Sequence, residues 1–276
     1  MKKLLSVAAF MLMLQPVFAQ FYVRSSIGYN LPANSQLIGE SSSLPYESST
    51  TSYKGVYGSY GSGFSIQAAV GGSISGTLGY DIELGYLLGR KYTLEEFYEG
   101  YTDPDDYLAT VDQSSQSFQV APSLTFIAGI GKVQPYTRIG PVLALTSMRS
   151  EIMKKYNSYD YQTGQEIPYH EAEEFKFNTG FSFGFKGVVG VNYELSEMLY
   201  IFSEISFISL SYSPKERELV SYTVNGEDAL DTVDPEYRKI EYKKEYEAHY
   251  YDNQPIREKK SMGSIGLHVG VKYVLK

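Results

Sequence analysis

Charged side chains recur at alternate positions inside otherwise apolar stretches of this 276-residue chain. In an extended strand, successive side chains point to opposite faces, so these charges share the face opposite the large apolar residues. The set is Arg24, Asp81, Glu83, Arg138, Lys186, Glu204, His268 and Lys272. Charges of both signs on one face could pair with one another, line a conduction path or, where a histidine stands beside carboxylates, act as general acids and bases.

We predict that these charges pair with one another inside a barrel. Side chains fill the lumen of an eight-stranded barrel, which leaves no aqueous channel and requires the buried charges to pair with one another or with trapped water. Counted from the short-turn ends of their strands, four of the charges come from successive strands at similar height. We therefore predict a lumen charge network in which Glu204 bridges Lys186 and Lys272.

Histidine and aspartate elsewhere point only weakly to catalysis or metal binding. His268 faces the lumen by alternation, and His170 and His249 lie in connecting segments without a paired nucleophile. The aspartates within residues 102–106 lack the glycine and distal glutamate of an EF-hand loop. The chain has no cysteine, which excludes disulfides and cysteine-ligated metals. We predict no enzyme activity, no catalytic residue, no cofactor and no metal.

The N-terminal segment has the form of a secretory signal peptide. Two lysines precede an apolar run over residues 4–14, and Val17-Phe18-Ala19 has the small-x-Ala form that signal peptidase cuts. The apolar run is too short to span a bilayer. The sequence therefore predicts removal of residues 1–19 and a single exported β domain over residues 20–276.

Period-two alternation of apolar and polar residues marks eight strands in that domain. They cover residues 21–29, 64–71, 77–86, 118–126, 136–145, 177–190, 199–207 and 264–275. Short turns at 71–73, 129–132 and 192–197 alternate with four long connections, which include hairpin signals at Thr163-Gly164 and Val224-Asn-Gly-Glu227. Residues 240–246 could extend the last strand. Pro122 and Pro141 predict a local irregularity, because proline cannot donate to a sheet ladder.

The last strand is two-faced and needs a partner, which the first strand can supply by closing a barrel. A soluble barrel would turn its apolar face inward. Glycines on the polar face and aromatic residues near the strand ends favour the opposite arrangement, with lipid outside. The aromatic residues are Phe21, Phe126, Tyr193 and Tyr273 toward the short turns, and Tyr29, Tyr86, Phe118 and Phe177 toward the long loops. We predict an all-β, eight-stranded antiparallel up-and-down transmembrane β-barrel with four long extracellular loops.

The end of the last strand carries a family resemblance. Gly270, the aromatic Tyr273 and the apolar Leu275 resemble the C-terminal signal by which the barrel-assembly machinery recognises its clients. Together with the strand pattern, they make the chain similar to the small outer-membrane β-barrel proteins, the OmpX-like and PorT-like families, over nearly all of its mature length. The resemblance implies the outer membrane of a Gram-negative bacterium, insertion by that machinery, and contact with outer-membrane lipid and lipopolysaccharide. It implies no specific activity.

The long connections are the most promising interaction surface. The formal charge of −8 argues against nucleic acid as a partner, because phosphate binding needs a basic surface. Of the 27 tyrosines, many lie in these connections among charged residues, a composition common at binding surfaces. We expect either protein or surface contacts there, or stiffening of the protruding hairpins. A subunit of an envelope secretion or uptake complex, and a lipid-modifying enzyme, remain alternatives.

Overall fold

The computed structural model describes residues 20–45, 50–98, 107–129, 131–160, 163–178, 180–245 and 256–275. The predicted signal peptide, the aspartates of residues 102–106 and His249 lie outside these ranges. Among the described residues, no helix is long and apolar enough to cross a membrane.

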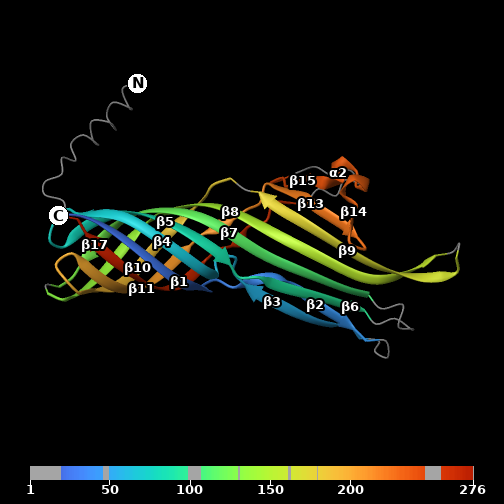
Figure 1. The fold of residues 1–276 in the computed structure, drawn as a ribbon, viewed down its shortest axis with the longest axis horizontal. Coiled ribbons are helices and arrows are strands. Elements are labelled where there is room, and N and C mark those ends of the chain that lie inside the picture. The colour runs from blue at the N-terminus through green and yellow to red at the C-terminus, as the bar shows by residue number, and fades with distance from the viewer. Residues whose placement is uncertain are drawn as a thin grey trace, which may run out of the picture.

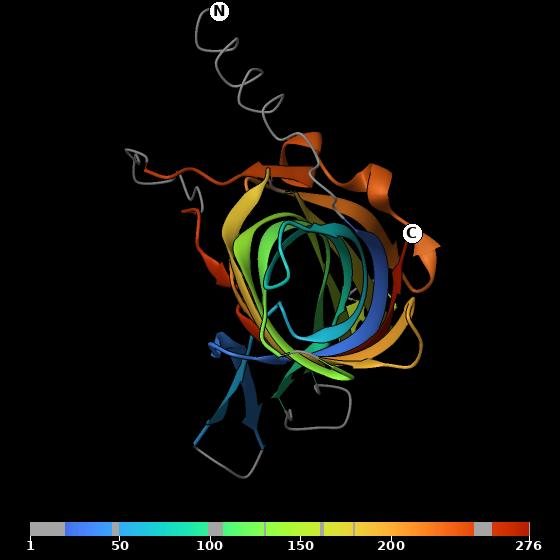
Figure 2. The same ribbon diagram turned by 90° about the vertical axis from the view of Figure 1, so that its left-hand side faces the viewer.

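Eight strands form a ring, seen end-on in Figure 2. They are β1 (Phe21–Pro32), β4 (Gly63–Ser73), β5 (Leu78–Gly89), β7 (Tyr107–Ile127), β8 (Val133–Asp160), β10 (Ser182–Glu194), β11 (Leu199–Ser209) and β17 (Ser264–Val274). Each pairs antiparallel with the next, and β17 pairs with both β11 and β1. The prediction that the last strand pairs with the first is therefore confirmed.

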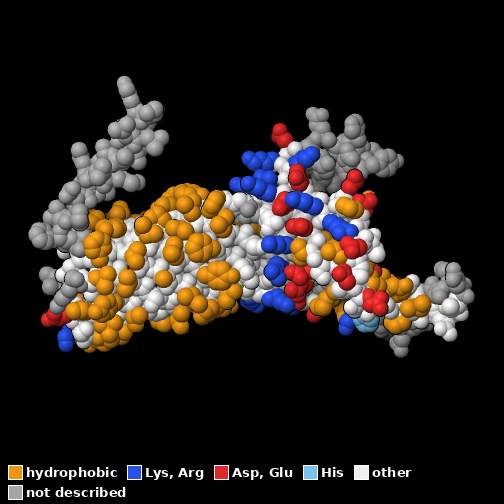
Figure 3. Space-filling view, turned by 45° about the horizontal axis from the view of Figure 1, so that its top comes forward, with side chains coloured by type: hydrophobic (Ala, Val, Ile, Leu, Met, Phe, Trp, Pro, Cys, Tyr) orange, Lys and Arg blue, Asp and Glu red, His pale blue; other side chains and the backbone are white. Residues whose placement is uncertain are grey.

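Alternation along these strands places apolar side chains outside and polar side chains inside. Ile82, Phe183 and Leu267 are 47%, 60% and 60% exposed. In Figure 3 apolar side chains cover the barrel part of the visible face, and charged side chains gather beyond it. The pattern arises because the side-chain period of a strand is two, so a residue's parity along its strand decides its face.

The two strand prolines interrupt one ladder, as predicted. Pairing between β7 and β8 runs to Val120 opposite Leu143 and resumes at Leu124 opposite Ile139, with the register unchanged. Pro122 and Pro141 fall inside this gap. The irregularity is thus a local loss of pairing rather than a bulge that shifts the register.

Three short turns and the two ends of the described chain lie together, at the left in Figure 1. Residues 74–77, 128–132 and 195–198 join the neighbouring strands there. The backbone N–H of Leu275 also donates to the carbonyl of Phe21, at 2.7 Å. The short and long connections therefore lie at opposite ends of the ring.

The long connections are not loops alone, which corrects the sequence-based expectation. They contain β2 (Gln36–Leu44), β3 (Ser52–Gly58), β6 (Tyr92–Tyr98), β9 (Gln165–Asn178), β12 (Ser211–Tyr212), β13 (Glu216–Val224), β14 (Glu227–Asp228), β15 (Lys239–Glu241), β16 (Lys260–Ser261), η2 (Leu230–Thr232) and α2 (Pro235–Arg238). Strands β7 and β8 continue past the ring, where β6 pairs with β7 and β9 pairs with β8. We call the part of these four strands that lies beyond the ring the extension. Backbone pairing forms this extension even where no apolar period marks it, because exposed strands need only their ladder bonds and cross-strand contacts.

Both predicted hairpin turns are present, whereas the predicted lengthening of the last strand is not. Asn225 and Gly226 have φ of 51° and 83° and connect β13 to β14, as a type I′ turn requires. Gly164, with φ of 68°, lies at the tip between β8 and β9. The extension of the last strand by residues 240–246 is wrong, because Lys239–Glu241 pair with β13 instead.

Candidate functional site: the charged lumen and its apolar cap

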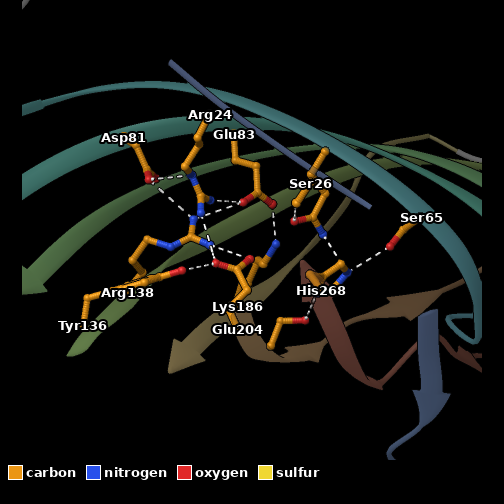
Figure 4. A network of polar contacts seen from close by, with 12 residues as sticks. Arg24, Ser26, Ser65, Asp81, Glu83, Tyr136, Arg138, Lys186, Glu204 and His268 are labelled. Carbon is orange, nitrogen blue, oxygen red and sulfur yellow. Dashed lines mark hydrogen bonds and ion pairs between the residues drawn. The ribbon is translucent and has the colours of Figure 1, made fainter. Parts of the chain in front are cut away.

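Six of the eight predicted lumen charges meet in one buried cluster (Figure 4). We call it the lumen network. It comprises Arg24 of β1, Asp81 and Glu83 of β5, Arg138 of β8, Lys186 of β10 and Glu204 of β11. Each occupies an inward position of its strand, so the network links five of the eight strands.

The two arginines hold the network together. Arg138 donates from Nη1 to Glu83 at 3.0 Å and from Nη2 to Glu204 Oε2 at 2.8 Å. Arg24 reaches Glu204 Oε2 at 3.0 Å through Nη1, Glu83 Oε2 at 2.5 Å through Nη2, and Asp81 at 3.3 Å through Nε. Each arginine thus contacts all three carboxylates, since Arg138 Nη1 also lies 3.4 Å from Asp81. The planar guanidinium suits such multiple contacts because its donors form a rigid fork.

Three cations and three anions balance in the network. Lys186 Nζ binds Glu83, and the Tyr136 hydroxyl donates to Glu204 at 2.7 Å. All six charged side chains are at most 8% exposed. Desolvated charges are tolerated only when they are paired and hydrogen-bonded, so removal of any one member leaves an uncompensated charge. Among the described residues, no group of three or more His, Cys, Asp or Glu is arranged to hold a metal ion.

The predicted bridge from Glu204 to Lys186 and Lys272 is wrong. Glu204 pairs with the two arginines, whereas Lys186 binds Glu83. Lys272 lies over the ring of Tyr22, at 4.2 Å from its centroid, and takes no part in the network's ion pairs. Counting from strand ends failed because neighbouring strands are staggered: the residues level with Glu204 are Gly190 and His268.

His268 is fully buried beside the network and is held by uncharged partners. Its Nε2 lies 2.9 Å from Ser65 Oγ and 3.2 Å from Gln67 Nε2, and its Nδ1 lies 3.4 Å from Ser206 Oγ. A Cβ on Gly28 would overlap with the His268 ring, so that glycine provides space for the imidazole. The three partners occupy inward positions on β4 and β11, which the alternation in the sequence indicates, but nothing in the sequence pairs them with His268.

An apolar cap fills the lumen toward the long loops. Its buried members include Tyr60, Leu87, Tyr92, Val142, Met148, Ile208, Tyr212 and Met262. Tyr60 comes from the turn between β3 and β4, and its hydroxyl donates to Gln113. The Tyr92 hydroxyl donates to the Ser59 carbonyl at 2.9 Å. The cap was missed because Tyr60, Tyr212 and Met262 lie outside every predicted strand.

The predicted assembly signal lies at the C-terminal end of β17, the short-turn end of the ring. Tyr273 and Leu275 are 44% and 45% exposed on the outward face, and Gly270 faces inward. A Cβ on Gly270 would overlap with the Ser25 carbonyl oxygen, so the glycine permits close contact with β1. Recognition by an assembly machinery stays a prediction.

Seven of the eight aromatic residues predicted at the strand ends are exposed on the outward face, and the eighth is misplaced. Phe177 belongs to β9 rather than to β10 and packs against the apolar cap. Its ring also stacks on Tyr242, with centroids 6.4 Å apart. Alternation assigned the wrong strand because β9 and β10 follow one another with little separation.

Tyrosines of the extension contact one another and nearby carboxylates. Tyr156 stacks on Tyr169 at 5.7 Å and approaches Tyr107 at 6.4 Å. Its hydroxyl donates to Glu171 at 2.6 Å, and this hydrogen bond raises the pKa of Tyr156 to about 12. Tyr98 and Tyr237 are exposed. Tyr222 of the long connections is partly buried. The side chains of further tyrosines in these connections lie outside the described part: Tyr101, Tyr159, Tyr161, Tyr246, Tyr250 and Tyr251.

The proteins similar to this chain are solved structures of outer-membrane proteins, found by comparison of structures and not by comparison of sequences. No protein-family model and no curated protein matches the chain. Neisserial surface protein A is 12% identical, with a TM-score of 0.40, covering 92% of this chain and 97% of that one. A major outer membrane protein from Thermus thermophilus is 12% identical, with a TM-score of 0.38 and coverage of 94% and 100%. CarO2 of Acinetobacter baumannii is 11% identical, with a TM-score of 0.31 and coverage of 92% and 99%.

Proposed function

We propose that the chain is an integral outer-membrane β-barrel protein without enzyme activity, whose long-loop extension contacts proteins or other surface molecules outside the cell. The inside-out pattern carries this proposal. Large apolar side chains are exposed on the outward face of all eight ring strands, while six charges are buried within. Contiguous apolar surface on this scale is unfavourable in water, whereas contact with the hydrocarbon of a membrane removes this unfavourable hydration.

The arrangement of connections supports an orientation. Membrane barrels of this type keep short turns and both chain ends on the periplasmic side and extend long connections outside. Here the three short turns share one end with Phe21 and Leu275, and β7, β8 and β9 project from the other. The lumen network and the apolar cap fill the interior between these ends, which supports a structural barrel rather than a conduit.

The geometry around His268 supports a non-enzymatic role. Ser65 and His268 make a hydroxyl–imidazole contact of the kind that activates a nucleophile. However, the two residues are only 4% and 0% exposed, and Gln67 and Ser206 also contact the ring nitrogens of His268. A nucleophile must reach its substrate, so we interpret the pair as a hydrogen-bonded part of the lumen packing.

Single cysteines provide the test, because the natural chain has none. We expect Lys155→Cys in the extension to react with a membrane-impermeant maleimide on intact cells. Gly76→Cys, in a short turn, should react only after the outer membrane is opened. Ile82→Cys and Leu267→Cys should stay unlabelled in both conditions and react after detergent unfolding. Rapid labelling of Ile82→Cys in intact membranes would show that water, not lipid, meets the apolar face.

A further inference from the structure

The β10–β11 ladder stops early at the loop end, beside a pocket on the barrel surface. Its last pair is Phe185 opposite Ser209, although on its other side β10 continues to pair with β8 as far as Ser182. Beyond Ser209 the chain turns into β12, which pairs with β16. A pocket of about 540 Å³ lies between the end of β10 and these two short strands.

The pocket has two chemically distinct sides. Phe183 and Phe185 form its apolar side, each 60% exposed on the outward face, with ring centroids 5.4 Å apart. Lys259 and Lys260 line the other side, together with amide and hydroxyl groups that include Asn34 and Ser211. Lys260 pairs with Glu258 at 2.8 Å, whereas Lys259 has no ion pair with any described residue.

The outward apolar side chains of the ring strands form a band that we call the apolar belt. The pocket lies at the level where this belt ends. On the neighbouring β8, the outward side chains change from Leu143 and Leu145 to Arg149. Phe183 is directly opposite Leu143. If the belt lies in hydrocarbon, Phe183 and Phe185 meet acyl chains near the outer boundary, and the lysines stand among the headgroups. Basic side chains at this depth attract lipid phosphates.

We propose that this pocket binds a phosphorylated glycolipid of the outer leaflet. An acyl chain packs against Phe183 and Phe185, a phosphate contacts Lys259 and Lys260, and sugar hydroxyls bond to Asn34 and Ser211. The chain carries a net charge of −8, so attraction of an anion depends on these local lysines rather than on the overall field. The inference rests on the proposed membrane location and adds a defined lipid site to it.

The full-length protein, purified in mild detergent, allows a direct test by native mass spectrometry with added lipid A, phosphatidylglycerol or inorganic phosphate. We expect the wild type to retain lipid A. The K259A/K260A variant and Phe183→Ser should each lower the affinity for lipid A about tenfold, equivalent to about 1.4 kcal/mol. The matched controls are Lys155→Ala, an exposed lysine of β8, and Phe126→Ser, an exposed phenylalanine at the short-turn end of β7, away from the pocket.

Unchanged lipid A retention in both pocket variants would overturn the proposal, as would equal losses in the controls. Equal retention of phosphatidylglycerol would overturn the glycolipid assignment, and displacement by inorganic phosphate would show an anion site without lipid. Heat-dependent gel mobility verifies that each variant is folded. If the cysteine labelling supports a membrane barrel while the pocket variants bind lipid A normally, only this inference fails.

Discussion

The short-turn part of the lumen and its loop-end part are enclosed by the same ring of strands but filled by opposite chemistry. The lumen network, with Arg24, Arg138 and their carboxylates, fills the first. Tyr60, Met262 and other apolar side chains fill the second. Every member of the network comes from a ring strand, whereas the cap recruits residues from connections. The stability of the lumen network depends on specific ion pairs, whereas that of the apolar cap depends on the volume and shape of its side chains.

The largest expected effect comes from breaking the network. Arg138→Met leaves three carboxylates facing two cations in a desolvated space, which should destabilise the barrel by about 3–5 kcal/mol. The measurement is the urea dependence of the heat-modifiable gel shift. Arg149→Met is the control, because Arg149 pairs with Glu174 at an exposed site and should lose less than about 1 kcal/mol. Similar losses in both variants would refute the special role of the buried pairs.

Truncating the cap should cost less on average and should not depend on charge. Met262→Ala removes a side chain that is 1% exposed, and such core truncations cost about 2–5 kcal/mol. Met153 is 43% exposed on β8, so Met153→Ala serves as the control and should leave the unfolding midpoint nearly unchanged. The same urea titration, repeated in high salt, should show an equal loss for Met262→Ala. A salt-dependent loss would contradict the apolar character of the cap.

The boundary between the two parts can be tested through glycine. Gly140 stands between Arg138 and Val142, and a Cβ there would overlap with the Pro122 carbonyl oxygen. Gly140→Ala should force a backbone shift and cost about 1–3 kcal/mol. Gly187→Ala is the matched control, since a Cβ at Gly187 meets nothing within 4 Å. Equal unfolding midpoints for the two variants would show that the proline gap tolerates extra volume.

The smallest expected effect comes from an ion pair outside the lumen, and it tests how strongly burial increases the contribution of an ion pair to stability. Lys154 pairs with Glu173 at 2.7 Å in the extension, outside the lumen. Lys154→Met should reduce the stability of the extension by about 0.2–1 kcal/mol, and salt should screen the difference. Lys155→Met, an exposed neighbour without an ion pair to any described residue, should have no effect. Limited proteolysis of the β8–β9 hairpin provides the readout, and a loss as large as that of Arg138→Met would contradict the comparison.

Prediction from sequence worked best where structure follows from local alternation. The ring strands, the inward placement of Asp81 and Lys186, and the irregularity at Pro122 all follow from residue parity or from a missing donor. It was weaker where contacts join distant segments. The strands of the long connections carry little apolar period, and Phe177 was assigned to the wrong strand, because pairing with a distant partner decides these elements.

The sequence by itself determined which side chains share a face of each strand, because a two-residue period needs no knowledge of neighbouring strands. The glycines on the polar face and the aromatic residues near the strand ends then indicated that the polar face is the enclosed one. It therefore identified the charges that must be neutralised inside the ring. Only the tertiary structure decided that Glu204 meets Arg24 and Arg138 rather than Lys186, because the stagger between strands sets the relative heights. The same holds for the cap and the lipid pocket, since Tyr60 and Lys259 reach the barrel through connections whose paths no local pattern specifies.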